Sequence, residues 1–252
     1  MVGVDQLTHY DGVPSDTLAS HLGVPMCLTL KRVASVLDVV HGLAEEGAPD
    51  GTAVLADEQT AGRGRQGRRW YSPAGAGIWL GYLKRPGPGA ENGIMALRVG
   101  LALRDVLAEL GVTVWLKWPN DLLICDRKLG GILCEARWSG AKAAWVAVGI
   151  GLNVRSPVPR ELAERAIALD QVREVRRIEV LERLLPILGG LPASSELTEV
   201  EMLAYAAGDW LRGRALAQPL AGTVRGIATD GALLVETGAR IRRVIGGSVV
   251  TA

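Results

Sequence analysis

The feature that most constrains the fold is a run of short apolar segments in the middle of the chain. These segments are residues 112–117, 122–125, 129–138 and 143–148, and only a few residues separate each from the next. Their lengths and spacing are typical of strands, with Asp126-Arg127-Lys128 as a tight turn between the second and the third. The pattern predicts a meander of paired strands.

Helical patterns flank this meander. Residues 33–46 predict a helix that ends at Gly47, and a second helix is expected from a cap at Asn92 to Leu110. Short apolar segments at residues 52–56 and 78–83 predict further strands. Helices followed by a meander indicate the α+β class, with a mixed sheet and helices packed against it.

The last third of the chain changes character. Residues 160–210 predict helix, with Leu181, Leu184, Leu185 and Leu188 on one face. Residues 213–252 contain short β segments separated by glycines, with Asp230-Gly231 as a hairpin signal, which predicts a small β-barrel. We therefore expect an N-terminal extension (1–30), a large domain (31–211) and a small C-terminal domain (212–252).

Composition excludes several classes of function. A net charge of +1 gives no global attraction for nucleic acid or anionic membranes. The 3 cysteines and 3 histidines are scattered, so neither a disulfide framework nor a metal held by protein ligands alone is expected. With no signal peptide and no long apolar run, we expect a soluble, cytoplasmic protein. Residues 16–24 predict one short helix, too little for specific DNA binding.

The strongest local motif is Gly62-Arg63-Gly64-Arg65-Gln66-Gly67-Arg68-Arg69-Trp70, within a segment (residues 61–77, the Gly-Arg loop) too rich in glycine to be a strand or helix. Glycines let a backbone approach a ligand closely, and arginines donate in pairs to carboxylate or phosphate. The motif predicts a loop that folds over a phosphorylated intermediate. Disordered contact with RNA is the alternative.

A second motif is Lys117-Trp118-Pro119-Asn120-Asp121, at the end of a predicted strand. Pro119 favours an extended Trp118, so that Lys117 can point its ammonium group into a cleft. Paired glycines follow in Lys128-Leu129-Gly130-Gly131-Ile132 and in Gly149-Ile150-Gly151-Leu152-Asn153. Glycines inside strands are typical of places where a ligand or another backbone comes close, although simple turns and bulges also use them.

Together with Asp57-Glu58-Gln59-Thr60-Ala61 before the Gly-Arg loop and Glu135 after the first glycine pair, these motifs resemble the biotin protein ligases in order and spacing. The resemblance covers about residues 30–155, and the tail from residue 213 is similar to the small SH3-like C-terminal domain of that family. It implies a catalytic domain like those of class II synthetases.

The resemblance also implies an activity. Such an enzyme activates biotin with ATP and Mg²⁺ as biotinyl-5′-AMP and transfers the biotin to a lysine of a biotin carboxyl carrier protein. A lipoate-type ligase of the same fold and a biotin-binding regulator without activity stay open as alternatives. We expect neither a membrane nor a specific DNA sequence as a partner. For the oligomeric state, monomer and homodimer both stay open.

Residue roles follow from the resemblance alone. Lys117 and Arg65 match catalytic positions, and Asp121 lies near the position that handles Mg-ATP. Contacts to biotin or its adenylate are implied for Ser35, Gln59, Gly62, Arg63, Gly64, Arg65, Lys117, Gly131 and Asn153. Related ligases carry Ser-Thr-Asn where this chain has Ser35-Val36-Leu37, so the resemblance does not extend to the Thr and Asn contacts.

Overall fold

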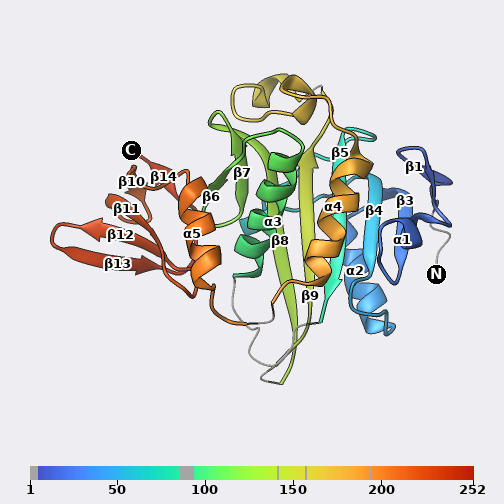
Figure 1. The fold of residues 1–252 in the computed structure, drawn as a ribbon, viewed down its shortest axis with the longest axis horizontal. Coiled ribbons are helices and arrows are strands. Elements are labelled where there is room, and N and C mark those ends of the chain that lie inside the picture. Colours follow the sequence, from blue (N-terminus) through green and yellow to red (C-terminus); the bar gives the residue numbers. More distant parts are fainter. Residues whose placement is uncertain (1–4, 86–93, 141, 157, 193) are drawn as a thin grey trace.

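A mixed seven-stranded sheet forms the centre of the molecule (Figure 1). The computed structural model describes residues 5–85, 94–140, 142–156, 158–192 and 194–252. The strand order is β3-β4-β5-β9-β8-β7-β6. The strands are β3 (Cys27–Val33), β4 (Ala53–Gln59), β5 (Gly77–Lys84), β6 (Trp115–Lys117), β7 (Asp121–Ile124), β8 (Arg127–Ser139) and β9 (Lys142–Asn153).

The predicted meander is confirmed as β6 to β9, which pair antiparallel in succession. The turn between β7 and β8 is made by Cys125 and Asp126, both with positive φ, one residue earlier than predicted. β9 also continues well beyond residue 148, to Asn153. Among the named strands of the described chain, β3 and β4 alone pair in parallel, so the predicted mixed sheet and α+β class are correct.

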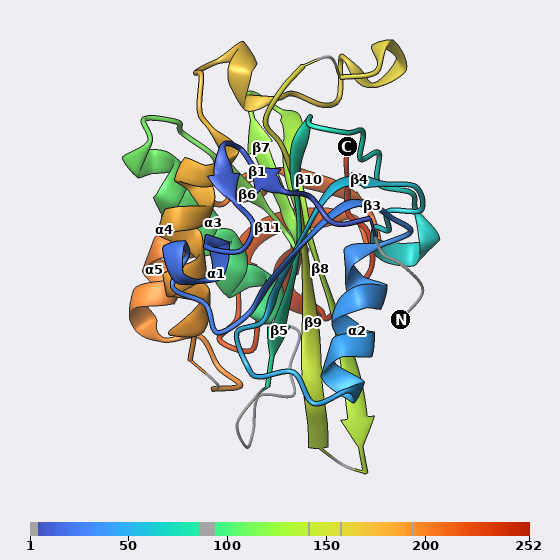
Figure 2. The same cartoon turned by 90° about the vertical axis from the view of Figure 1, so that its right-hand side faces the viewer.

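Helices cover both faces of the sheet (Figure 2). On one face, α2 (Val36–Glu45) packs against β4, β5 and β9. The other face carries α3 (Met95–Glu109) and α4 (Arg177–Gly189), with α5 (Glu199–Gly208) beside α3. The helix predicted from residue 33 starts only at Val36, because Val33 ends β3, a strand that the sequence did not predict. The predicted cap Asn92 lies outside the described residues.

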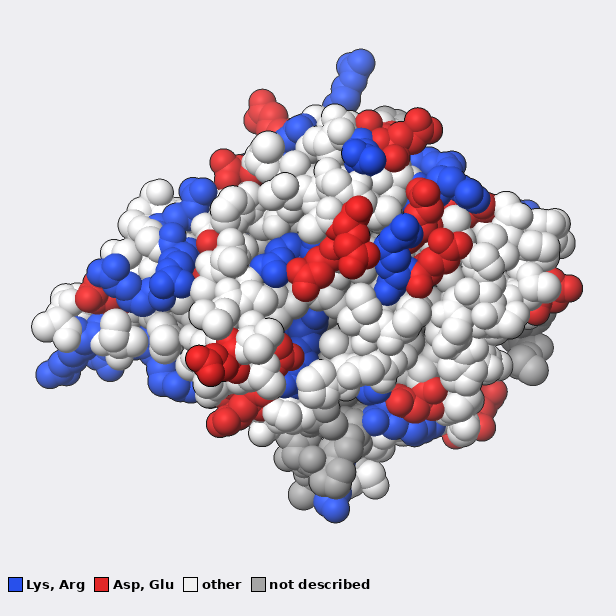
Figure 3. All heavy atoms as spheres, in the orientation of Figure 1, with Lys and Arg blue, Asp and Glu red and all other residues white. Residues whose placement is uncertain are grey.

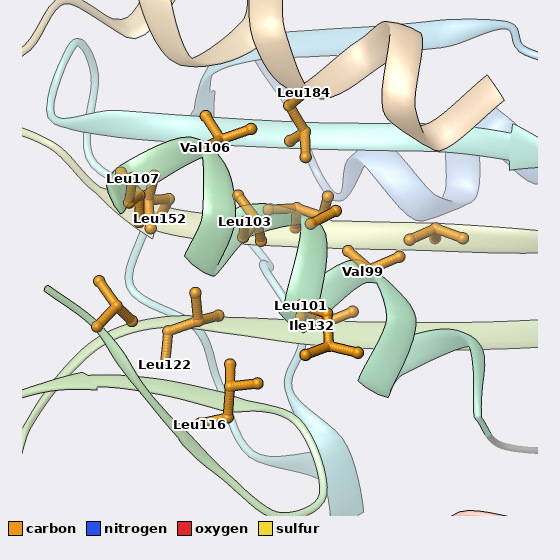
Figure 4. Close-up of a cluster of buried hydrophobic side chains, with 14 of the residues drawn as sticks. Val99, Leu101, Leu103, Val106, Leu107, Leu116, Leu122, Ile132, Leu152 and Leu184 are labelled. Carbon is orange, nitrogen blue, oxygen red and sulfur yellow. The ribbon is translucent and has the colours of Figure 1, made fainter. Parts of the chain in front are cut away.

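The larger hydrophobic core lies between α3, α4 and the sheet (Figure 4). Val99, Leu103 and Val106 of α3 are at most 1% exposed, and they meet Leu184 of α4 and Leu152 of β9. Each such side chain contributes about 1.5–3 kcal/mol by leaving water. The extensive burial of α3 and the apolar face of α4 are as predicted.

The prediction of helix throughout residues 160–210 was wrong in part. Between β9 and α4 the described residues form the short 3₁₀ turns η2 (Arg160–Leu162) and η3 (Leu169–Gln171) and no α-helix. Here part of the backbone bonds to another strand: Lys128 N–H of β8 donates to the carbonyl of Arg165 at 2.7 Å, and the Lys128 carbonyl accepts from Ile167 N–H at 3.0 Å. Tertiary pairing has therefore replaced helical hydrogen bonds in this segment.

The C-terminal residues form a separate five-stranded antiparallel sheet, in the order β13-β12-β11-β10-β14. Its turn at Asp230-Gly231 is confirmed: Gly231 has φ +83°, and the Asp230 carboxylate accepts from Ala232 N–H at 3.2 Å. Lys and Arg side chains gather over this sheet in Figure 3. Its strands are β10 (Ala215–Gln218), β11 (Gly222–Ile227), β12 (Leu233–Thr237), β13 (Arg240–Val244) and β14 (Val250–Thr251).

Residues 5–30 pack into the large domain. They form the hairpin β1 (His9–Tyr10) and β2 (Val13–Pro14) and the short helix α1 (Leu18–His21), and the predicted boundary at residue 30 falls inside β3. Tyr10 and Leu18 are fully buried in the larger core. Within the described residues, the structure has no helix of the length and hydropathy needed to cross a membrane.

Candidate active site

A cleft of about 990 Å³ opens over the sheet beside the start of α2. Its walls come from the first turn of α2, the end of β4, the Gly-Arg loop, the β6–β7 turn, the middle of β8 and β9, and residues 247–249 of the C-terminal domain. Nearly every motif singled out in the sequence therefore meets in one place.

One cross-strand row forms the middle of the cleft. Trp79 lies opposite Gly151, Gly151 opposite Gly131, Gly131 opposite Asp121, and Asp121 opposite Lys117. Directly paired residues of antiparallel strands project to the same face of a sheet. The row therefore puts the side chains of Trp79, Asp121 and Lys117 on one face, with two glycines between them.

The indole of Trp70, from the Gly-Arg loop, lies over these two glycines. A Cβ atom on Gly151 would come within 2.4 Å of Trp70 Nε1, and one on Gly131 within 3.4 Å of its ring. Gly151 is required because any side chain at this position would displace the indole. Lys128 Nζ lies 5.1 Å from the centre of the Trp70 ring, a cation–π distance.

The deep end of the cleft is lined by polar groups that already bond to one another. Gln59 Oε1 accepts from Val36 N–H at 3.0 Å, and Gln59 Nε2 donates to Ser72 Oγ at 2.9 Å. Ser35 caps α2 by accepting from Leu37 N–H at 3.4 Å. The Leu37 side chain covers Gly149, where a Cβ would lie 3.1 Å away. This end suits a largely neutral group held by shape.

The mouth of the cleft carries cations without carboxylate partners. Neither Lys117 nor Arg65 forms an ion pair with any part of the chain that the structure describes. Lys117 Nζ lies 4.8 Å from the centre of the Trp210 ring, and Arg65 Nη1 donates to Asn120 Oδ1 at 3.4 Å. Burial lowers the pKa of both groups, although nearby Asp121 opposes the shift. Such uncompensated, partly buried cations are suited to an anionic ligand.

Asp121 and Arg63 also line the cleft, and both form ion pairs within the chain. Asp121 forms a 2.6 Å ion pair with Lys128. Arg63 bonds to Asp38 of α2 and to Glu135 of β8, so its guanidinium group is already engaged within the protein.

The C-terminal domain closes one side of the cleft. Ser248 donates to Gln66 Oε1 at 2.8 Å and accepts from Arg68 Nη2 at 3.2 Å. Trp118 Nε1 donates to the carbonyl of Gly231 at 2.9 Å. The small domain thus contacts both the Gly-Arg loop and the Lys-Trp-Pro motif.

Comparison with known proteins agrees with this arrangement. Residues 31–153 match the model of the biotin/lipoate A/B protein ligase family, and residues 212–251 match that of the biotin protein ligase C-terminal domain. A bifunctional ligase/repressor BirA of Bacillus spizizenii is 31% identical over an alignment that covers 94% of this chain and 76% of that protein.

The chain belongs to the biotin protein ligase family.

Two further relatives extend this result. The biotin–[acetyl-CoA-carboxylase] ligase of Mycobacterium tuberculosis is 38% identical over 56% of this chain and 49% of its own length. A solved structure of the Aquifex aeolicus biotin protein ligase in complex with biotin and ATP superposes with a TM-score of 0.74, at 27% identity, over 90% of this chain and 99% of that one.

The structure brings the predicted site residues together in the cleft, with one exception. Ser35, Gln59, Lys117, Asp121 and the others line its walls, namely Arg63, Gly64, Arg65, Gly131 and Asn153. Gly62 stands behind the wall, where a Cβ would lie 2.7 Å from the carbonyl of Trp70 and 2.8 Å from Ser72 Oγ. It supports the loop and does not face the cleft.

The sequence did not single out several residues that complete the site. Trp70, Lys128 and Gly151 stood within quoted motifs, but only the strand register shows that they stack. Asn120 accepts from Arg65 and donates to the carbonyl of Ile132 at 2.7 Å. Ser248 lies more than a hundred residues after β8 in the chain, and no local sequence pattern indicates that it belongs to the site.

Proposed function

We propose that this chain is a biotin protein ligase that adenylates biotin with ATP and then transfers biotin to a lysine of a biotin carboxyl carrier protein. The observation that carries the proposal is the contrast along one cleft: polar groups bond to one another at the deep end, whereas Lys117 and Arg65 at the mouth form no ion pair with the described residues. Biotin is a neutral ring system on a chain that ends in a carboxylate, and ATP carries a triphosphate. The ring would fit the deep end, and the carboxylate and the triphosphate would meet at the cationic mouth.

In the first step the biotin carboxylate attacks the α-phosphate of ATP, a P–O bond forms, and pyrophosphate leaves. Two anions meet in this reaction, so cations fixed in advance lower its barrier. Lys117 can bridge the carboxylate and the phosphate, and Arg65 can hold the phosphate from the loop. Burial lowers the pKa of Lys117, and a bound anion would raise it again and so favour the charged form.

In the second step the amine of a carrier lysine attacks the carbonyl of the mixed anhydride, and AMP leaves. The Gly-Arg loop covers the position of the anhydride, so it would keep water out until the carrier arrives. Asn153 supports the far wall, because its side chain donates to the carbonyl of Ile167 at 3.1 Å.

Magnesium is proposed to arrive with ATP. The described residues contain no group of three or more His, Cys, Asp or Glu side chains that could hold a metal ion by themselves. One carboxylate, Asp121, lies in the cationic mouth, paired with Lys128. A single carboxylate fits a magnesium ion that is bound mainly by the phosphates of ATP and by one side chain. The ion would neutralise phosphate charge at the mouth.

A lipoate-type ligase is the second candidate, and a specific feature favours it. Val36 and Leu37 stand where related ligases carry Thr and Asn, which makes the deep end more apolar. The Gly-Arg loop and the Lys-Trp-Pro-Asn-Asp motif favour biotin. A regulator that binds biotin without transferring it would form no adenylate, although it would share the deep end.

The test is a labelling assay with a purified carrier domain. Biotin, ATP and Mg²⁺ together should label the carrier on a streptavidin blot, and pyrophosphate should appear even without carrier. Lipoate in place of biotin is the control for the second candidate. Labelling that proceeds equally well without ATP would contradict adenylation, and binding without pyrophosphate would indicate a regulator.

A further inference from the structure

The Gly-Arg loop contains two arginines, two residues apart, whose side chains are held in different ways. Arg63 Nη1 lies 2.7 Å from Asp38 Oδ1, and its Nε and Nη2 lie 3.4 and 3.3 Å from the two carboxylate oxygens of Glu135. Arg65, by contrast, makes one long hydrogen bond, to Asn120. Every nitrogen of the Arg63 guanidinium group is therefore engaged within the protein, whereas Arg65 has donors to spare.

The partners of Arg63 come from two different elements. Asp38 lies in the first turn of α2, one turn from the capping Ser35, and Glu135 lies on β8. The ion pairs thus connect the base of the loop to the helix and to the sheet that form the deep end. We call Asp38, Glu135 and His41 the Arg63 seat.

His41 fixes the orientation of Glu135. It is 5% exposed; its Nε2 lies 3.1 Å from Glu135 Oε2, and its Nδ1 lies 3.0 Å from Trp145 Nε1. An indole N–H can only donate, so Nδ1 must accept. The proton of the neutral imidazole is then on Nε2, which donates it to Glu135. The carboxylate receives hydrogen bonds from His41 and from Arg63 at the same time.

We propose that the Arg63 seat positions the Gly-Arg loop, and that Arg63 is a structural latch whose side chain holds the loop in place while Arg65 contacts the phosphate. Asp38, Glu135 and His41 would then be positioning residues that act through Arg63. This inference rests on the proposed adenylation, because the loop is expected to retain the adenylate. It differs from the direct ligand contact of Arg63 that the resemblance implies.

The main experiment measures how fast biotinyl-adenylate leaves the protein, in a single turnover without carrier. Asp38→Asn and Glu135→Gln should each speed release by about two- to five-fold, the scale of a partly exposed ion pair. The dissociation constant of biotin alone should change less than two-fold, because the seat lies outside the cleft. Glu236→Gln, which neutralises the partner of Arg225 on the C-terminal sheet, is the matched control and should behave as wild type.

A double-mutant cycle separates a latch from general stabilisation. If Glu135 acts through Arg63, Glu135→Gln should add nothing to the release rate in an Arg63→Ala background. Independent multiplication of the two effects would overturn the proposal. So would an Arg63→Ala variant that loses biotin affinity while both seat variants release adenylate as slowly as wild type, since Arg63 would then be a ligand contact.

A measurement that needs no ligand distinguishes failure of the latch from failure of the proposed function. In the free protein, trypsin should cut after the loop arginines faster in Asp38→Asn and Glu135→Gln than in wild type or Glu236→Gln. Wild-type protein that forms no adenylate would refute the ligase activity but leave this readout intact. Equal cutting in all variants would overturn the latch.

Discussion

The deep end and the mouth of the cleft differ in what their polar atoms bond to. At the deep end Gln59, Ser72 and Ser35 bond to one another or to the backbone of α2, within a wall that includes Leu37. At the mouth Lys117 and Arg65 are partly buried and lack an ion pair within the described chain. The first region is complete without a ligand, whereas the second is electrostatically incomplete until an anion binds. Under the proposed function, the difference means that shape would select the acid and charge would drive the adenylation.

Removing a charge at the mouth should have the largest effect. Lys117→Ala is expected to slow adenylate formation by roughly 10² to 10³, the scale for losing one group that stabilises developing charge. Pyrophosphate release in a rapid-quench assay measures this rate. Lys31→Ala, on the exposed edge strand β3, is the control. Adenylation near the wild-type rate in Lys117→Ala would mean that the mouth does not act through this cation.

The second cation should affect retention more than formation of the intermediate. Arg65→Ala removes charge-assisted hydrogen bonds to a phosphate, worth about 1.5–3 kcal/mol each, so release of biotinyl-adenylate should quicken by about ten- to a hundredfold. Biotinylation of bystander proteins should follow and can be blotted. Arg183→Ala, whose side chain bonds to α4 outside the cleft, should show neither change. An unchanged adenylate lifetime would contradict the role of Arg65.

At the deep end the expected effect is smaller and concerns affinity alone. Val36→Thr should restore one hydrogen bond to the ligand and tighten biotin binding by about two- to a hundredfold, because such a bond is worth about 0.5–1.5 kcal/mol and a buried polar atom without a partner costs about 1–3 kcal/mol. Calorimetric titration measures it, with Val39→Thr on the same helix as the control. Equal or weaker binding would show that the apolar wall formed with Leu37 replaces the missing contacts.

The smallest change is expected where the C-terminal domain meets the loop. Ser248→Ala removes the hydrogen bonds to Gln66 and Arg68, each worth about 0.5–1.5 kcal/mol, and should raise the KM for ATP by about two- to tenfold with little change in biotin affinity. Ser194→Ala, far from the cleft, serves as the comparison. A KM for ATP identical to that of wild type would show that the small domain does not assist ATP binding through Ser248.

Much of the fold could be predicted because its signals are local. The meander from β6 to β9, the apolar face of α4 and the turn at Gly231 each follow from spacing or from one residue with positive φ. β3 could not be found in this way. It is an edge strand whose Lys31 and Arg32 are exposed, so no apolar alternation marks it, and its parallel pairing with β4 supplies the hydrogen bonds. The segment from residue 160 was wrongly predicted as helix because its pairing with Lys128 of β8 is also a contact between distant segments, which no local pattern indicates.

The sequence by itself determined which residue types this protein offers: the glycines and arginines of the loop, the lysine at a strand end and the paired glycines within strands. Tertiary structure alone decided what they do. Strand register sets Lys117, Asp121 and Gly131 in one row. The same folding turns Arg63 toward Asp38 and Glu135 while leaving Arg65 free of ion pairs within the described chain. The physical reason is that register and ion pairing depend on contacts between segments far apart in the chain, which no local pattern encodes.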